Sequence, residues 1–181
     1  VNYNHKAGTI RLYRGNCDCP GYADCFLLHA VNHQPAPEME PEAYGKINAE
    51  ILTKFLVENG IVVVSGLASG IDAIAHKTTI ESGGKTVAVL GTPLDKYYPY
   101  ENHKLQDEIM NNHLVITQFK IGTPIQRSNF PIRNRTMALI SDASIIVEAN
   151  DGSGTYHQGW EALRLGRPLF ILEDNLKNKH D

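Results

Sequence analysis

The sequence predicts an α/β fold with a doubly wound, mostly parallel sheet. Short apolar runs rich in β-branched residues alternate with segments of helical periodicity. The runs are apolar along nearly their whole length, as in strands that are covered on both faces. Repeated strand, helix and strand order builds a parallel sheet through right-handed crossovers. The predicted strands are Thr9–Tyr13, Ile61–Ser65, Thr86–Leu90, Leu114–Thr117, Ser144–Glu148 and Pro168–Leu172.

Helices are expected between these strands, several of them ending at glycines. Apolar side chains recur at helical spacing from Tyr44 to Leu56, and Gly60 ends that helix. The other expected helices lie around Ile71–Thr78, around Leu105 and Ile109, from Arg133 onward, and from Tyr156 to Leu163.

The segment from Asn16 to Pro41 departs from the pattern and is too long for a tight strand-to-helix turn. We interpret it as an irregular insertion near the N-terminus of a single domain spanning residues 1–181. It holds all three cysteines of the chain. An odd number of cysteines does not make a disulfide framework, which favours a reducing compartment.

A zinc site is a minor alternative for this insertion. Cys17, Cys19, Cys25 and His29 cluster in the sequence, and Cys25, His29 and His33 fall on one face of a possible helix. Cysteine and histidine are suitable zinc ligands, but the cluster lacks a CxxC pair. We therefore expect reduced thiols and neither a metal nor a cofactor.

Charge and hydropathy narrow the classes of function. The 181 residues carry a net charge of −3, which argues against a broad basic face that grips long duplex DNA. No apolar run is long enough to span a membrane, and the start does not resemble a signal peptide. We expect a cytoplasmic protein.

Two glycine-containing turns follow predicted strands and open predicted helices. The first reads Ser65-Gly66-Leu67-Ala68-Ser69-Gly70-Ile71-Asp72 and the second Asp151-Gly152-Ser153-Gly154-Thr155. Glycine permits close approach of the backbone to a ligand, and free amides at a helix start attract anions. Each of these sequences is explained equally well by a tight turn that binds no ligand. Two such turns at one edge of the sheet, however, favour an anion-binding groove.

Basic and aromatic side chains occur between these turns. Arg133, Asn134 and Arg135 stand at a predicted helix start. The helix dipole disfavours cations at this end, so a bound anion explains the two arginines better than dipole matching does. Internal ion pairs with Asp95 or Glu148 are the alternative. Lys96 precedes two tyrosines that can stack on unpaired bases, although packing as loop anchors is expected for at least one of them.

Four motifs occur in order along the chain: Ser65-Gly66-Leu67-Ala68-x-Gly70-Ile71-Asp72-x-x-Ala75-His76, Gly83-Gly84-x-Thr86 through Gly91, Leu94-Asp95-x-x-Tyr98-Pro99-x-x-Asn102, and Phe130-Pro131-x-Arg133-Asn134-Arg135. Together they resemble the DNA-processing protein A (DprA/Smf) family over roughly Tyr44 to Leu172.

The resemblance implies an extended Rossmann-like fold that binds single-stranded DNA without catalysis, forms a homodimer and loads the RecA recombinase. Phosphates would lie on the first turn and near Arg133 and Lys96, so Arg133→Ala or Arg135→Ala should weaken binding more than folding. The sequence departs from the family at Ser69, where a basic residue is usual, and Arg14 only approximates an arginine after the first strand.

The same fold suggests an alternative. The second turn resembles that of lysine-decarboxylase-like phosphoribohydrolases, which place a glutamate where this chain has Gln158; Glu161 lies one turn further on. A carboxylate is needed there to stabilise positive charge at the glycosidic bond. A nucleotide-binding sensor therefore ranks ahead of a hydrolase, and both rank behind a single-strand binder.

Overall fold

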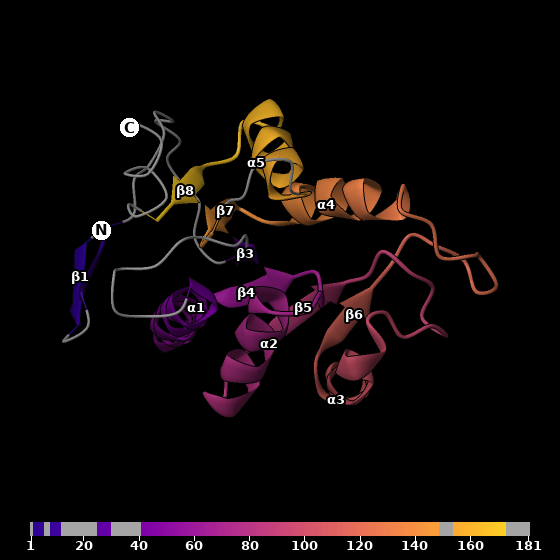
Figure 1. The fold of residues 1–181 in the computed structure, drawn as a ribbon, viewed down its shortest axis with the longest axis horizontal. Coiled ribbons are helices and arrows are strands. Elements are labelled where there is room, and N and C mark those ends of the chain that lie inside the picture. The colour runs from indigo at the N-terminus through magenta and orange to yellow at the C-terminus, as the bar shows by residue number, and fades with distance from the viewer. Residues whose placement is uncertain (1, 6–7, 12–24, 30–40, 149–153, 173–181) are drawn as a thin grey trace.

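The computed structural model describes residues 2–5, 8–11, 25–29, 41–148 and 154–172 (Figure 1). Its centre is a six-stranded, all-parallel sheet, which confirms the predicted fold class. The strands lie in the order β6-β5-β4-β3-β7-β8. Their bounds are β3 Cys25–His29, β4 Val62–Ser65, β5 Thr86–Val89, β6 Leu114–Ile116, β7 Ala143–Ile146 and β8 Leu169–Ile171.

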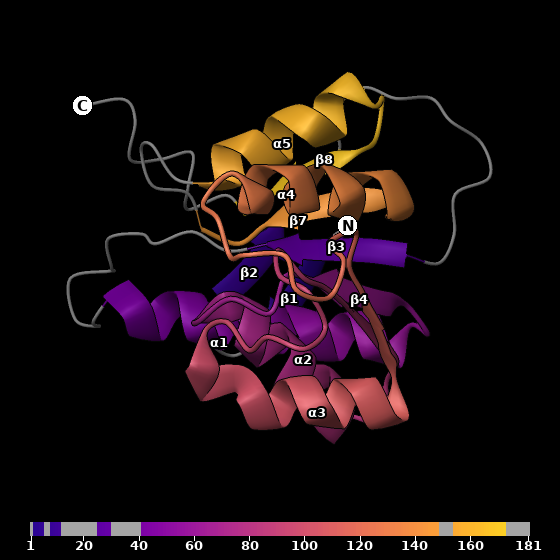
Figure 2. The same cartoon turned by 90° about the vertical axis from the view of Figure 1, so that its right-hand side faces the viewer.

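Helices cover both faces of this sheet (Figures 1 and 2). One face packs against α1 (Pro41–Glu58), α2 (Ile71–Glu81) and α3 (His103–Asn112), and the other against α4 (Asn129–Ile140) and α5 (Gly154–Arg164). A short 3-10 helix, Tyr100–Asn102, precedes α3. In the described part of the chain, every helix is too short or too polar to cross a membrane.

The strand order contains one topological reversal. From β3 the chain moves outward through β4 and β5 to the edge strand β6, and then returns through α4 to β7 on the other side of β3. Ligands of open parallel sheets bind beyond the carboxyl ends of the strands near such a reversal. The loops after β4, β5 and β6 all leave from this carboxyl edge.

The core follows the alternation of side chains along the strands. Val63 of β4 packs in a cluster with Leu52 and Leu56 of α1, whereas the next residue, Val64, packs with Met137 of α4 on the opposite face. Successive side chains of a strand point to opposite faces, so a strand covered on both sides must be apolar throughout. This explains the continuous apolar runs in the sequence.

The start of the sheet differs from the sequence prediction. The predicted strand Thr9–Tyr13 overlaps β2 (Gly8–Arg11), which pairs antiparallel with β1 (Asn2–His5) in a separate two-stranded sheet. The parallel sheet instead uses β3, which lies inside the segment interpreted as an irregular insertion. A run of only three apolar residues between Cys25 and His29 is too short to stand out as a buried strand.

This strand also removes the helical face on which the zinc alternative depended. Cys25 and His29 are the two ends of β3. A rise of about 3.3 Å per residue separates their Cα atoms by about 13 Å, too far for both to be ligands of one zinc ion. Cys17, Cys19 and His33 lie outside the described residues.

Candidate nucleic-acid interface

The loop between β4 and α2 is held by the side chain of Asp72. Its carboxylate accepts hydrogen bonds from Ser65 Oγ at 2.9 Å and from Ala68 N at 3.2 Å. Asp72 lies in the first turn of α2, where the helix dipole favours a negative charge. Ser65 and Asp72 are buried, whereas Ser69 and Gly70 are exposed. Within the predicted phosphate loop, only Ser69 and Gly70 are therefore fully exposed to solvent.

The residues around the 3-10 helix fix the same loop from the other side. Asn102 Nδ2 donates to Leu67 O at 3.0 Å and to Ala68 O at 3.2 Å. Leu67 adopts a positive φ of 60°, and these contacts hold it there. Ser69 Oγ donates to the carboxylate of Glu101. Asn102 thus supports the loop from within, and Glu101 adds a negative charge beside the position where the family usually has a cation.

Arg133 of α4 lies in the interior beneath this loop. It is only 5% exposed, and its Nη1 donates to Gly66 O at 2.5 Å and to Val89 O at 3.2 Å. A Cβ atom at Gly66 would stand 1.6 Å from Nη1, so this close approach requires glycine. Burial lowers the pKa of Arg133, and the nearby charge of Asp72 opposes that shift. Arg133 therefore ties the carboxyl ends of β4 and β5 to α4.

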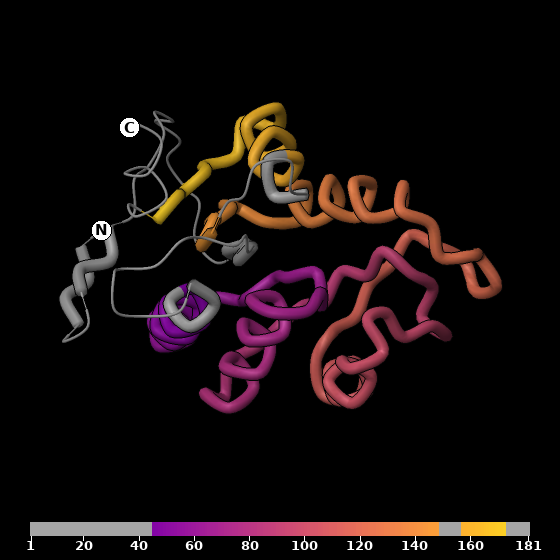
Figure 3. The backbone as a smooth tube through the Cα atoms, viewed as in Figure 1, coloured from indigo at the N-terminus to yellow at the C-terminus, as the bar shows by residue number. Residues whose placement is uncertain are grey.

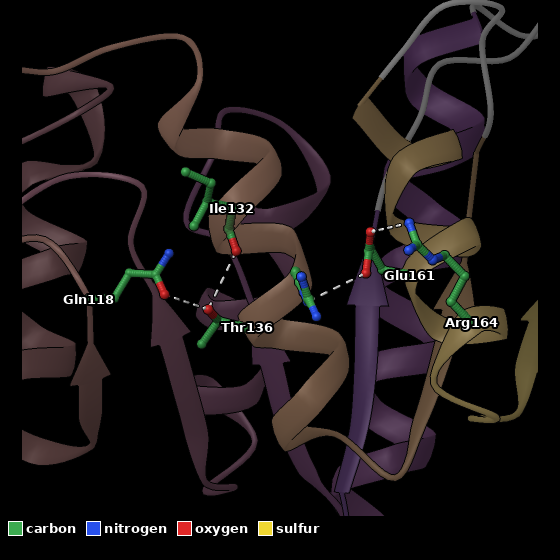
Figure 4. A network of polar contacts seen from close by, with 6 residues as sticks. Gln118, Ile132, Thr136, Glu161 and Arg164 are labelled. Carbon is green, nitrogen blue, oxygen red and sulfur yellow. Dashed lines mark hydrogen bonds and ion pairs between the residues drawn. The ribbon is translucent and has the colours of Figure 1, made fainter.

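Arg135, two residues later, faces outward. It pairs with Glu161 of α5 at 3.8 Å, and Arg164 approaches the other oxygen of Glu161 at 3.7 Å (Figure 4). The partner of Arg135 is thus neither Asp95 nor Glu148. Asn134 is buried. The three consecutive residues predicted to share one anion site consequently face different environments.

His76 of α2 is buried and hydrogen-bonded in the interior. Its Nδ1 lies 2.7 Å from Thr86 Oγ1, whose hydroxyl donates to Val63 O at 2.9 Å. Burial lowers the pKa of His76 to about 4 despite the charge of Asp72. Ser65 donates its hydroxyl to Asp72 in the same buried region.

Exposed aromatic side chains follow Lys96, which is itself exposed, in the loop after β5. Tyr97 donates its hydroxyl to Asp107 at 2.7 Å, and this hydrogen bond raises its pKa. Tyr98 contacts the ring of Phe130, at 5.4 Å between centroids, and remains half exposed. Tyr100 stacks on His103. One tyrosine is therefore an anchor, as predicted, while Tyr98 and Tyr100 offer ring surface to solvent.

The second predicted turn follows β7 in the sequence, and β7 is one of the two strands at the topological reversal. Strand β7 is followed by Glu148, a buried residue whose carboxylate lies against Gly45 of α1. A Cβ atom on Gly45 would stand 1.6 Å from Oε1 of Glu148. Helix α5 begins at Gly154, in agreement with the predicted helix start. Arg14 and Ser153 lie outside the described residues, as do the side-chain surroundings of Thr155.

A segregation of charge was missed in the sequence analysis. No Asp or Glu occurs between Glu108 and Asp142, although this stretch contains Lys120, Arg127, Arg133 and Arg135. The stretch has a charge of +4, which leaves −7 for the rest of a chain whose total is −3. Lys120 and Arg127 are exposed in the loop that joins the carboxyl end of β6 to α4. The acid-free run was visible in the sequence, but net charge alone conceals it.

Comparisons with known proteins agree with this architecture. Residues 39–181 match the family model described as DNA recombination-mediator protein A. The chain belongs to this family. It is 34% identical over 174 residues to the DNA processing protein DprA of Streptococcus pneumoniae, and 36% identical over 136 residues to that of Bacillus subtilis. These alignments cover 95% and 75% of the chain.

A solved structure of the family gives the same fold. The DNA processing protein A of Helicobacter pylori, whose structure is described in terms of a single-stranded DNA binding mode, superposes with a TM-score of 0.71 at 30% identity. The superposition covers 82% of this chain and 64% of that one. The chain spans 58% and 46% of the S. pneumoniae and B. subtilis family members.

Proposed function

We propose that this chain binds single-stranded DNA along the carboxyl edge of its sheet. Its family membership and the single-stranded DNA binding mode of the H. pylori protein support this proposal. The observation that carries it is the acid-free, basic stretch between Glu108 and Asp142, part of which lies at this edge. A narrow basic strip suits one flexible strand, since a duplex presents phosphates over a broad face.

The exposed groups provide both kinds of contact that a single strand needs. Lys96, Lys120 and Arg127 are available to phosphates, and the exposed backbone at Ser69 and Gly70 lies at the positive end of α2. Tyr98 and Tyr100 offer ring faces for stacking with bases. Arg133 and Asn102 act as positioning residues beneath the loops.

We expect Lys96→Ala to weaken binding of a single-stranded oligonucleotide about fivefold at low salt, because one charged phosphate contact is lost. Salt dependence should also fall, since each contact to a single strand contributes ~0.7 to the slope of log affinity against log salt. Fluorescence anisotropy measures both quantities.

The matched control is Lys85→Ala. Lys85 is also exposed, but it immediately precedes β5 and so lies at the opposite edge of the sheet. Both substitutions remove one positive charge, but only Lys96→Ala removes it from the proposed interface. Equal losses for the two variants would indicate nonspecific attraction and contradict the placement of the interface.

We propose binding without catalysis. The hydroxyl of Ser65 is buried and bonded to Asp72, and a buried amide, Gln158, stands where the related hydrolases have a carboxylate. Prolonged incubation should return a labelled strand or a nucleoside monophosphate unchanged. Cleaved strand or a released base in the chromatogram would contradict this.

A homodimer is part of the proposal. On α5, Trp160 is 64% exposed and Leu163 52%, and the adjoining α4 exposes Leu139 and Ile140. Exposed large apolar side chains on packed neighbouring helices are typical of a subunit interface. Sedimentation equilibrium should report a dimer that Trp160→Glu converts to monomer; a monomeric parent protein would exclude the dimer.

The recipient of the bound strand is proposed to be RecA, in keeping with the family description as a recombination mediator. RecA should assemble faster on a strand that carries this chain than on the bare strand. An unchanged assembly rate would leave DNA binding intact and exclude RecA loading.

A further inference from the structure

The loop between β6 and α4, residues 117–128, is anchored firmly at its base. Thr117 Oγ1 lies 3.2 Å from Leu90 O and 2.8 Å from Thr92 O, which attaches the loop to the end of β5. Thr136 Oγ1 donates to Gln118 Oε1 at 3.2 Å, which attaches it to α4 (Figure 4). The loop thus leaves the carboxyl edge in a defined direction.

Beyond this base the loop projects past the rest of the carboxyl edge (Figure 3). Thr123 N donates to Lys120 O at 3.0 Å, which closes a turn with Gly122 at a φ of +86° in its third position. Glycine suits this position of a type II turn. Ile121, the residue before it, is 75% exposed, more than any other large hydrophobic side chain in the described part of the chain.

Lys120 and Arg127 lie on either side of this apolar tip in the sequence. Lys120 and Arg127 are exposed, and neither forms an ion pair with another described residue. The surrounding acid-free stretch offers them no carboxylate from nearby in the sequence. A nucleic acid offers both phosphates for the two cations and apolar base faces for the tip. An acidic protein surface would match only the cations, and an apolar protein surface would match only the tip.

We propose that this loop is a wedge for the junction between single-stranded and duplex DNA, with Ile121 entering the first base step of the duplex. The inference rests on the proposed single-strand binding. A strand that follows Lys96 and the tyrosines along the edge continues toward this loop, so an adjoining duplex would meet the projecting tip. Aliphatic side chains unstack base pairs in this way, while cations hold the phosphates on either side.

The test compares a single strand with the same strand extending from a hairpin, using fluorescence anisotropy. The chain should bind the tailed hairpin about fivefold more tightly. Ile121→Ser should abolish this preference and leave binding of the isolated strand unchanged. Ile47→Ser removes an exposed isoleucine from α1, on the other side of the sheet, and should change neither affinity.

A second readout follows the base pair itself. With 2-aminopurine at the first paired position of the hairpin, the parent chain should increase fluorescence by unstacking that base, and Ile121→Ser should not. Strand binding without hairpin preference or fluorescence increase would overturn the wedge and leave the proposed function standing. A preference retained by Ile121→Ser would also overturn it. Absence of binding to the plain strand would overturn the proposed function itself.

Discussion

Arg133→Met is expected to lower the free energy of unfolding by about 3–5 kcal/mol, the cost of disrupting a buried, hydrogen-bonded charge. The substitution removes the donor to Gly66 O and Val89 O and leaves the buried carboxylate of Asp72 without the nearby positive charge. Urea denaturation measures this change. Methionine keeps much of the side-chain volume, so cavity formation contributes little.

Arg135→Met provides the control for this prediction. The side chain of Arg135 is 65% exposed and makes one ion pair at 3.8 Å, so its loss should change stability by less than about 1 kcal/mol. Equal stability of the two variants would contradict the structural role of Arg133. The burial of Arg133 thus reverses the sequence-based expectation that its replacement affects binding more than folding.

Acidification from pH 7 to pH 4 should remove about 3 kcal/mol of stability through His76 alone. Its pKa is about 4 in the fold, against an ordinary value of 6.5. Between these values the unfolded chain binds the proton and the folded chain does not, so stability is complete above about pH 6.5 and is lost as pH falls toward 4.

Denaturation at a series of pH values tests this expectation. His76→Gln should be less stable at pH 7, and its stability should decline less between pH 6.5 and 4.5, a window that lies above the ordinary pKa values of carboxylates. His157→Gln removes an exposed histidine of α5 and should retain the steep decline of the parent. Parallel curves for the parent and His76→Gln would refute the assignment.

Most of the architecture was predictable because buried parallel strands have continuous apolar sequences. Val62–Ser65 and Thr86–Val89 stand out in this way, and Gly60 and Gly83 mark the ends of the helices that precede them. The strand Cys25–His29 was not predictable, since its polar ends conceal a short apolar centre. Its place between β4 and β7 depends on contacts distant in sequence.

The sequence indicated where the loops of the candidate site lie, but not which way their neighbouring side chains face. The strand ends and glycine turns correctly indicated the carboxyl edge of the sheet as the place of the loops. The orientation of a helix decides the rest: Arg133 and Arg135 are two residues apart, about 200° around α4, so one enters the interior when the other faces solvent. Sequence spacing alone does not say which.

The most direct test of the account is equilibrium binding of a labelled single-stranded oligonucleotide at low and moderate salt, with duplex DNA and mononucleotides as competitors. We predict that binding of the single strand weakens with salt, that duplex DNA competes with it poorly, and that mononucleotides leave it unchanged. No binding of the oligonucleotide, together with thermal stabilisation by a mononucleotide, would contradict the account and identify a nucleotide sensor instead.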